Sequence, residues 1–221
     1  MNSICSMLRK DLNIYTSCEV SPLVHKNGNY WPVFDVNGLL LGEFDWVIST
    51  APAPQTLTLF NRHIEYYHPL RYANMYGCYA LMLGFNKPWD RNWIAAKVRN
   101  NPIKWISVNS TKPGRAQDVT CLVVHSRNDL AQSHIEKDTE QVKMLLLEQF
   151  SQITNIDATN ADYVSLHRWS FAIIAKSAKQ GFYLDKNLCL AATSDWCETS
   201  RIEEVWLHAQ RLARYFNNII K

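Results

Sequence analysis

Two Asn-Gly pairs divide the stretch from Glu19 to Thr50, which reads EVSPLVHKNGNYWPVFDVNGLLLGEFDWVIST. Asn-Gly suits the two positive φ values of a type I′ hairpin turn, and each pair separates two runs of β-prone apolar residues. The spacing therefore predicts a three-stranded meander over Glu19–Lys26, Asn29–Val36 and Leu39–Thr50. Pro32 cannot donate a ladder hydrogen bond, so we expect an edge or a bulge in the middle strand.

Short apolar runs continue through the middle of the chain and are separated by proline-containing turns. They predict strands at Tyr76–Phe85, Trp93–Val98, Lys104–Val108 and Val119–His125. Strands that follow one another through short polar turns are typical of an antiparallel sheet rather than of βαβ units.

Two amphipathic helices are predicted after these strands. The first covers Val142–Ile153 and has an acidic start at Asp138. The second closes the chain, and Ser200-Arg201-Ile202-Glu203 matches a capping box at its start. We expect one apolar stripe of this helix to be core, namely Ile202, Val205, Trp206, Ala209, Leu212, Ala213, Phe216 and Ile220. A buried strand is predicted just before it, at Asn187–Ala192, and a strand, turn and capped helix together present backbone N–H groups to a polar ligand.

Composition excludes several classes of partner. The chain has 221 residues, 47% of them hydrophobic, and a net charge of +3, which favours neither nucleic acid nor an anionic membrane surface. No uncharged apolar stretch reaches the roughly 18–20 residues of a membrane span. The six cysteines are scattered without a CxxC pair, which is typical of reduced thiols, and we expect a cytoplasmic protein.

Missing motifs disfavour several kinds of enzyme. None of the 7 glycines belongs to a GxGxxG or GxxxxGK[ST] loop, and GxSxG and HExxH are absent from the sequence. A stand-alone hydrolase, kinase or zinc enzyme is therefore disfavoured, and we expect no metal site.

Four motifs in a fixed order carry a resemblance to a known family. They are Asp45–Gln55, Ser110–Arg115, His167-Arg168-Trp169 and Thr193–Cys197. In this order they resemble the later part of the renalase-like FAD-dependent oxidoreductases of the flavin-containing amine oxidase superfamily, from about Met7 to the end of the chain. The resemblance implies an α/β fold, α+β in its inserted part. Residues 1–54 and 186–221 would be the remaining parts of an FAD/NAD(P)-binding domain with a β-meander. Residues 55–185 would be an inserted substrate domain with an antiparallel sheet.

The same resemblance implies site residues. Val20 would make a backbone contact to the adenine, and Ala51 and Pro52 would lie near the dinucleotide. Asp195, preceded by Ser194, would bind the ribityl or phosphate region of FAD. The closing helix would point its N-terminus, at Arg201 and Ile202, toward the flavin ring. Arg168 and Trp169 are candidates for the pocket of a small-molecule substrate; no catalytic residue is assigned. Two plainer interpretations stay open: Asp195 also fits a turn cap, and Arg168 and Trp169 also fit an ordinary strand.

Two departures from the family pattern bear on activity. The resemblance starts after the GxGxxG segment that binds the FAD pyrophosphate. In addition, Ser194 stands where the family usually has glycine, and Glu204 and Val205 stand where it has small residues. The resemblance therefore implies a truncated oxidoreductase that binds flavin weakly or not at all alone, unless a complementing N-terminal chain supplies the rest. The alternative is a non-catalytic binding or interaction module. An exposed sheet edge would favour a homo-oligomer or a partner chain.

Overall fold

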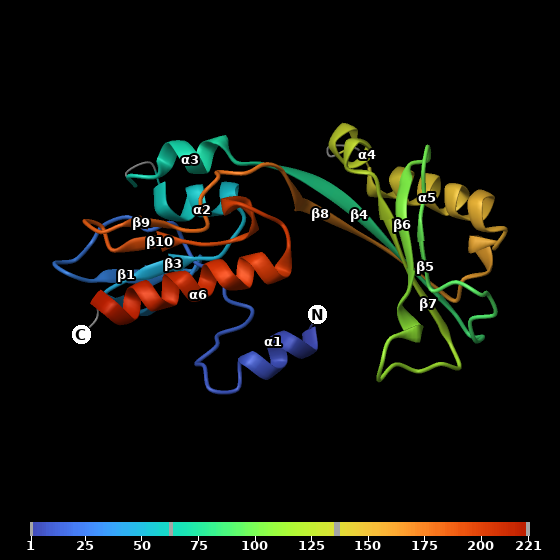
Figure 1. Cartoon of the computed structure of the whole chain (residues 1–221), viewed down its shortest axis with the longest axis horizontal. Helices are drawn as coiled ribbons and strands as arrows, with labels where there is room; N and C mark the ends of the chain where they lie inside the picture. Colours follow the sequence, from blue (N-terminus) through green and yellow to red (C-terminus); the bar gives the residue numbers. More distant parts are fainter. Residues whose placement is uncertain (1, 62–63, 135–137, 220–221) are drawn as a thin grey trace. The chain divides into compact units, whose positions relative to one another are not determined.

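The computed structural model describes residues 2–61, 64–134 and 138–219, which form two compact units (Figure 1). The first unit comprises Met1–Tyr72 and Ala178–Lys221, and the second unit comprises Ala73–Ser177. The second unit is thus inserted into the first along the sequence.

The first unit contains more of the chain than the resemblance implies. Helices α2 (Ala53–Phe60) and α3 (Tyr67–Tyr72) and strand β9 (Tyr183–Asp185) belong to it, although they lie largely within residues 55–185. The assignment of the two units as FAD-binding and substrate domains stays a prediction.

A five-stranded antiparallel sheet forms the second unit, in the order β5-β6-β7-β4-β8. Its strands are β4 (Asn74–Phe85), β5 (Ala95–Lys97), β6 (Ile103–Val108), β7 (Thr120–Ser126) and β8 (Tyr163–Lys176). The predicted antiparallel sheet is therefore confirmed. The longest strand, β8, was not among the predicted strands, because its core positions are interrupted by polar residues.

Helix α5 (Thr139–Thr154) covers this sheet (Figure 1) and closes the core of the second unit. Its Val142, Leu146 and Phe150 are completely buried against the strands. The Asp138 side chain accepts from the backbone N–H of Glu140, as the predicted acidic start requires. The remaining short helices of this unit are α4 (Asn128–Ser133), η2 (Asn109–Thr111) and η3 (Ala158–Asn160).

Two small sheets form the first unit. Strands β1 (Trp31–Phe34) and β2 (Leu40–Phe44) pair antiparallel, and β3 (Val47–Ser49) joins β10 (Leu190–Ala192) and β9 in the order β3-β10-β9. The pairing of β10 is parallel with β3 and antiparallel with β9. Helix α1 (Asn2–Leu8), the turn η4 (Asp195–Cys197) and helix α6 (Ile202–Ile219) complete the unit.

The predicted meander is correct in the position of its second turn and wrong at its end. A hairpin turn does connect β1 and β2, but only Gly38 has a positive φ, of +84°, and Asn37 does not, so the turn is not the expected type I′. The predicted bulge is present between Val33 and Phe34. The third predicted strand is instead divided into β2 and β3, which lie in different sheets. Trp46 lies between them and packs edge-on against Phe216 of α6, with ring centroids 4.8 Å apart, so the chain leaves the hairpin there.

The predicted first strand of the meander is reduced to a short pairing. Val20 forms an isolated bridge with Asp35, and Asn27 and Tyr30 exchange backbone hydrogen bonds around Gly28. The predicted type I′ turn at Asn27-Gly28 is wrong: the turn has Gly28 and Asn29 as its central residues, of which Gly28 alone has a positive φ, and it connects no long strands.

Helix α6 starts at Ile202, one residue later than the predicted capping box implies, and its stripe also differs from the prediction. The backbone N–H of Val205 donates to the carbonyl of Arg201, which places Arg201 rather than Ser200 at the N-cap. Within the helix, His208, Leu212 and Phe216 are the buried residues. Ile202 and Trp206 are 63% and 47% exposed, so the expectation that the whole stripe is core is wrong. Ile220, the last residue of that stripe, lies outside the described residues.

Candidate functional site

The candidate site is the edge of the sheet where the parallel strands β3 and β10 end. Ser49 and Ala192 are register partners and are the last residues of the two strands. The segments that follow, Thr50–Pro52 and Thr193–Asp195, therefore leave the sheet side by side. Ligands of α/β proteins typically bind beyond the carboxyl ends of parallel strands. We call these two segments the carboxyl edge.

A set of buried hydrogen bonds fixes the carboxyl edge. The backbone N–H of Thr193 donates to the Ser49 carbonyl at 3.1 Å, which continues the strand pairing. The indole Nε1–H of Trp196 donates to the Ala51 carbonyl at 2.9 Å and joins the two segments directly. Thr56 donates to the same carbonyl at 3.0 Å. Because Trp196 is fully buried, we expect this edge to be rigid.

Helix α2 starts at the carboxyl edge and adds a partial positive charge. Pro52 is its N-cap residue, no side chain caps the helix, and Pro54 lies in its first turn. The first backbone N–H groups of a helix have no partner within the helix and favour a negatively charged group. The predicted Ala51 and Pro52 thus lie where a phosphate or a hydroxyl of a dinucleotide could bind.

Asp195 is the first residue of the turn η4 and the last residue of the carboxyl edge. Its Oδ1 accepts from the backbone N–H of Trp196 at 2.9 Å and from the Ser194 hydroxyl at 3.1 Å. Among the described residues, none donates to Oδ2, which leaves that oxygen for a ligand hydroxyl. Asp195 therefore lies in a turn and bonds the next backbone N–H, but it does not cap the turn: the N-cap residue is Ser194, and no side chain caps η4. The role of Asp195 toward a cofactor stays a prediction.

Ser194 fits its position without backbone strain. Its φ of −166° and ψ of −176° are extended values that any residue adopts. The departure from glycine at this position therefore does not distort the carboxyl edge.

The floor below the edge is aromatic and neutral. Trp196 stacks on Tyr183 with ring centroids 5.8 Å apart, and Tyr183 packs against Tyr66 at 5.6 Å. Burial raises the pKa of Cys197 to about 12 and, helped by that thiol, the pKa of Tyr183 to about 12. These groups stay protonated at neutral pH, so the floor supplies neither a nucleophile nor a general base.

The remaining predicted cofactor residues lie farther along the first unit. Arg201 and Ile202 are exposed at the start of α6, and the Arg201 guanidinium lies 3.9 Å from Glu204. Glu198, between them and η4, pairs with the buried His208 at 3.1 Å and so attaches this loop to α6. Val20, on the first short pairing, is 40% exposed. The structure thus brings Ala51, Pro52, Ser194 and Asp195 together and places the other three in separate segments.

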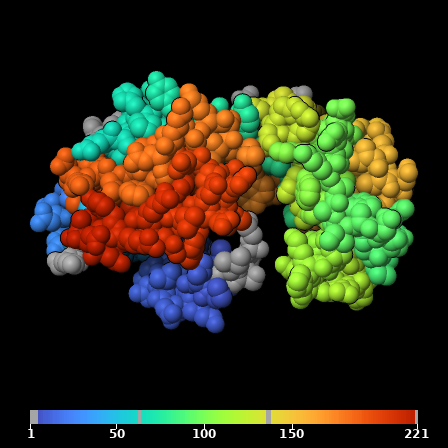
Figure 2. Space-filling model, viewed as in Figure 1, coloured from blue at the N-terminus to red at the C-terminus, as the bar shows by residue number. Residues whose placement is uncertain are grey.

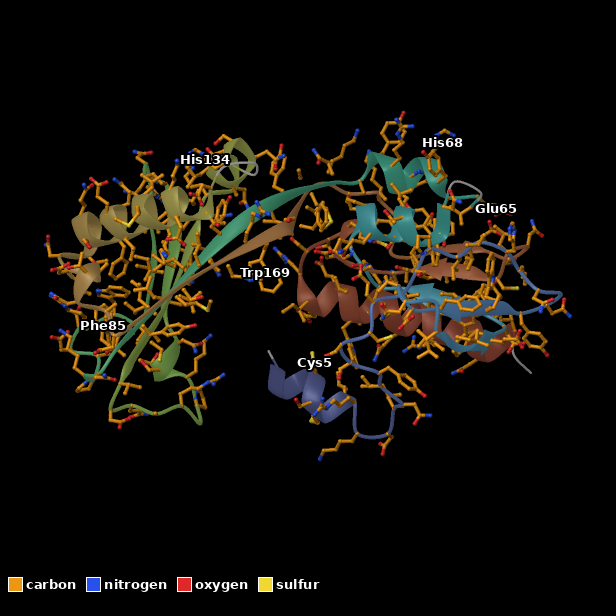
Figure 3. All side chains as sticks on the ribbon, turned by 180° about the vertical axis from the view of Figure 1, so that it is seen from behind. Cys5, Glu65, His68, Phe85, His134 and Trp169 are labelled. Atoms are coloured by element: carbon orange, nitrogen blue, oxygen red, sulfur yellow. The ribbon has the colours of Figure 1, made fainter. Side chains whose placement is uncertain are left out.

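The substrate-pocket candidates lie in the second unit, on β8. Arg168 is opposite Tyr79 of β4, and Trp169 is opposite Cys78. Trp169 is 55% exposed and its ring meets that of His167 edge-on at 4.3 Å (Figure 3). The strand interpretation is confirmed, and a role in substrate binding stays a prediction.

A bulge at Trp169 was missed by the sequence analysis. The register between β4 and β8 shifts between Tyr76 and Cys78, which face Ile173 and Trp169. Gly77 lies at this shift, and a Cβ there would come within 3.0 Å of the Trp169 carbonyl. Bulges re-aim side chains and are frequent beside active sites. A glycine inside an apolar strand was the available signal.

A cavity in the second unit was also missed. It has a volume of about 430 Å³ and is lined by Phe85 of β4 (Figure 3), Trp89, Ile156, Asp157 and Asp162, among others. Hydrogen bonds from Thr159 lower the pKa of Asp157, so this carboxylate is charged at neutral pH. Neither acid stands in a recognisable sequence motif.

Neither a membrane helix nor a metal cluster is found in the part of the chain that the structure describes. None of its helices is both long and apolar enough to cross a bilayer. It also contains no group of three or more His, Cys, Asp or Glu side chains placed to hold a metal ion.

Several solved structures share this fold, although no family model matches the chain. A putative protoporphyrinogen oxidase from Exiguobacterium sp. 255-15 is similar with a TM-score of 0.72 and 12% identity, over 97% of this chain and 50% of that chain. Cyclohexylamine oxidase from Brevibacterium oxydans IH-35A is similar with a TM-score of 0.66 and 10% identity, over 91% of this chain and 48% of that chain. An oxidoreductase from Methanosarcina mazei has a TM-score of 0.65 and 14% identity, over 91% of this chain and 50% of that chain.

These similarities confirm the predicted resemblance at the level of the fold. The chain spans about half the length of the proteins that it matches. Its fold is thus that of part of these solved structures, while the flavin-dependent family and its renalase-like branch stay predictions.

Proposed function

We propose that this chain is the later part of an FAD-dependent, amine oxidase-like oxidoreductase and that the carboxyl edge binds part of the FAD. When bound, FAD would accept a hydride from a small reduced substrate, an amine or a nicotinamide derivative. The observation that carries the proposal is the convergence of Ala51, Pro52, Ser194 and Asp195 at the end of two parallel strands.

The residues present fit the ribityl and phosphate region of a dinucleotide. The uncapped start of α2 favours a phosphate, and the open Oδ2 of Asp195 can accept from a ribityl hydroxyl. Trp196 holds both segments in place through Ala51. The first unit contains no GxGxxG loop, so the proposal takes the pyrophosphate site to lie in residues outside this sequence, of the same chain or of another.

The proposal predicts weak FAD binding that depends on the charge of Asp195. A ¹⁵N-resolved NMR titration of the purified chain with FAD should shift the Trp196 indole N–H signal and the amides of the carboxyl edge. Asp195→Asn keeps an oxygen that can accept from the Trp196 N–H but loses the charge, so we expect about tenfold weaker binding, as for a charge-assisted hydrogen bond.

Asp157→Asn is the matched control, because Asp157 caps the turn η3 in the second unit through Thr159. This variant should bind FAD like the unchanged chain. Equal binding by the chain and Asp195→Asn, or no shift at the carboxyl edge at millimolar FAD, contradicts the proposed site. A 1:1 flavin absorption spectrum of the purified chain would leave the site in place and show that these residues bind FAD without any further segment.

A second candidate function is a non-catalytic interaction module. Most of the exposed large apolar side chains in the described part of the chain belong to the first unit, although the two units are similar in length. Such surfaces are typical of proteins that bind a partner. A folded chain that shows no FAD-induced shifts would favour this candidate.

A further inference from the structure

The cavity in the second unit lies between two segments that are far apart in the sequence. One wall is the segment 86–91, which follows strand β4, and the other is the segment 155–162, between helix α5 and strand β8. In Figure 2, green and amber atoms, the colours of these two segments, lie side by side on the second unit. The backbone N–H of Asn86 donates to Oδ2 of Asp162 at 2.7 Å, which joins the two walls at one end.

The floor of the cavity is apolar and is held by hydrogen bonds. Phe85, the last residue of β4, is buried there, and its register partner Thr120 donates to the carbonyl of Lys87 at 2.7 Å. Trp89 lies on the first wall, and its indole N–H donates to the carbonyl of Trp93 at 2.6 Å. The floor and the first wall therefore offer a hydrocarbon group of a ligand a surface that is already formed.

The charged side chains of the cavity are separated by sign. Lys87 lies on the first wall, with its Nζ 5.9 Å from the centre of the Phe85 ring. The carboxylates of Asp157 and Asp162 lie on the second wall. In the described part of the chain, no ion pair includes any of these three charged groups. The cavity thus keeps an ammonium on one wall and carboxylates on the other without pairing them.

Most of the other polar groups of the cavity already have partners. Asp90 and Arg91 pair with each other at 3.5 Å. Oδ1 of Asp157 accepts from the backbone N–H and the hydroxyl of Thr159, at 2.9 and 2.6 Å. By contrast, no described residue donates to Oδ1 of Asp162, whose other oxygen binds the opposite wall. That oxygen is therefore open to an ammonium group of a ligand.

A ligand that satisfies both walls must carry both charges. Its ammonium group would bind the Asp162 carboxylate, and its carboxylate would bind Lys87, each through a charge-assisted hydrogen bond. Its apolar part would lie on the Phe85 floor. An α-amino acid with an apolar side chain combines these three groups, and a volume of about 430 Å³ is within the ordinary range for small-ligand pockets.

We propose that this cavity binds an α-amino acid zwitterion whose side chain is apolar. The proposal uses residues of the second unit only and does not rest on flavin binding. Lys87, Asp157 and Asp162 are exposed, so water screens their charges, and the dissociation constant should lie near about 1 mM.

Three probes that share a phenyl ring test the proposal. L-phenylalanine carries both charges, phenethylamine carries only the ammonium, and hydrocinnamate carries only the carboxylate. In a ¹⁵N-resolved NMR titration of the whole chain, L-phenylalanine should shift the indole N–H signal of Trp89 and leave that of Trp196, in the first unit, unchanged. It should bind at least about tenfold more tightly than either other probe, because each of those lacks one charge-assisted hydrogen bond.

Two variants separate the contributions of the walls. Asp162→Asn keeps an oxygen for the Asn86 N–H but loses the charge, so it should weaken L-phenylalanine about tenfold and leave hydrocinnamate unchanged. Lys87→Gln should weaken L-phenylalanine by a similar factor and leave phenethylamine unchanged. Asp118→Asn and Lys112→Gln are the matched controls, because both residues are exposed in the same unit and do not line the cavity. Both controls should bind L-phenylalanine like the unchanged chain, and near-UV circular dichroism should report native folding of all four variants.

Four results would overturn the proposal. The first is a Trp89 signal that does not move at about 20 mM L-phenylalanine. Equal binding of L-phenylalanine and phenethylamine would show a site for a cation alone, and equal binding of L-phenylalanine and hydrocinnamate would show a site for an anion alone. The last is an equal loss of L-phenylalanine binding in the cavity variants and in their controls, which would place the bound ligand elsewhere.

Discussion

Cys197 shows how strongly burial changes the pKa of a single side chain in the first unit. Its side chain is fully buried at the end of η4, and burial raises the pKa of its thiol to about 12 from an ordinary value of 9.0. The unfolded chain loses this proton near pH 9, whereas the folded chain keeps it until about pH 12. Between these values the folded state binds more protons than the unfolded state.

The free energy of unfolding should therefore fall as pH rises above about 9, by up to about 1.4 kcal/mol per pH unit from this thiol. Below pH 9 the thiol is neutral in both states and has no such effect. Denaturant titrations between about pH 8 and about pH 11 should show a steeper fall for the unchanged chain than for Cys197→Ala. Cys5→Ala, at an exposed thiol, should keep the steep fall. If the free energy of unfolding depends on pH equally in all three proteins, the raised pKa assigned to the Cys197 thiol is wrong.

At the residue scale, the sequence predicted which residues lie at the carboxyl edge better than it predicted which side chains surround them. Ala51 and Asp195 were predicted from a motif, and they do lie at one edge, joined through Trp196. The bond from Trp196 to Ala51 spans 145 positions of the chain, and no local pattern predicts such a contact. The neutral floor formed by Tyr66 and Tyr183 was missed for the same reason.

At the scale of elements, helix α5 holds the sheet of the second unit together. Leu146 of α5 is completely buried in that core, whereas Met144, two residues earlier, is 63% exposed. Leu146→Ala should lower the free energy of unfolding by about 2–5 kcal/mol, since it removes buried methyl groups and leaves a cavity.

Met144→Ala provides the comparison on the same helix and should change the stability by less than about 0.5 kcal/mol. Thermal unfolding followed by circular dichroism measures both variants. If Leu146→Ala and Met144→Ala unfold at the same temperature, the described packing of α5 is wrong.

Elements were predictable where one local signal dominated. The Asn37-Gly38 turn and the periodicity of α5 gave the correct hairpin and helix. The stripe of α6 was misjudged, because periodicity marks all apolar residues alike and cannot tell a buried row from an exposed one. The division of the third meander strand followed from Trp46, whose partner in α6 is remote in sequence.

At the scale of the whole molecule, the second unit is joined to the first by two neighbouring strands. Asn74 and Lys176 are register partners at the ends of β4 and β8, so the chain enters and leaves this unit at almost the same place. Paired residues in an antiparallel sheet have Cα atoms only about 4.5–5.5 Å apart. A short linker between Tyr72 and Ala178 can therefore replace the second unit.

The first unit, with about four Gly or Ser residues in place of Ala73–Ser177, is expected to fold. Its near-UV circular dichroism should retain the signal of the packed Trp46 and Trp196, and the Trp196 indole N–H should exchange slowly with solvent. Ala191→Asp in the same shortened chain is the control for loss of the core, because Ala191 is fully buried. A shortened chain that resembles Ala191→Asp would show that the first unit needs the second.

The parallel pairing of β3 with β10 also has a consequence for the order of events on the ribosome. Val47–Ser49 are synthesised about 140 residues before Leu190–Ala192, and at about 5–20 residues per second this delay is several seconds or more. During that time Ile48 is an exposed apolar residue of a strand without its partner. If the second unit folds first, its adjacent ends at Asn74 and Lys176 shorten the loop that the late pairing must close. The folded second unit would then bring β10, the last strand to be synthesised, close to β3 and so favour their pairing.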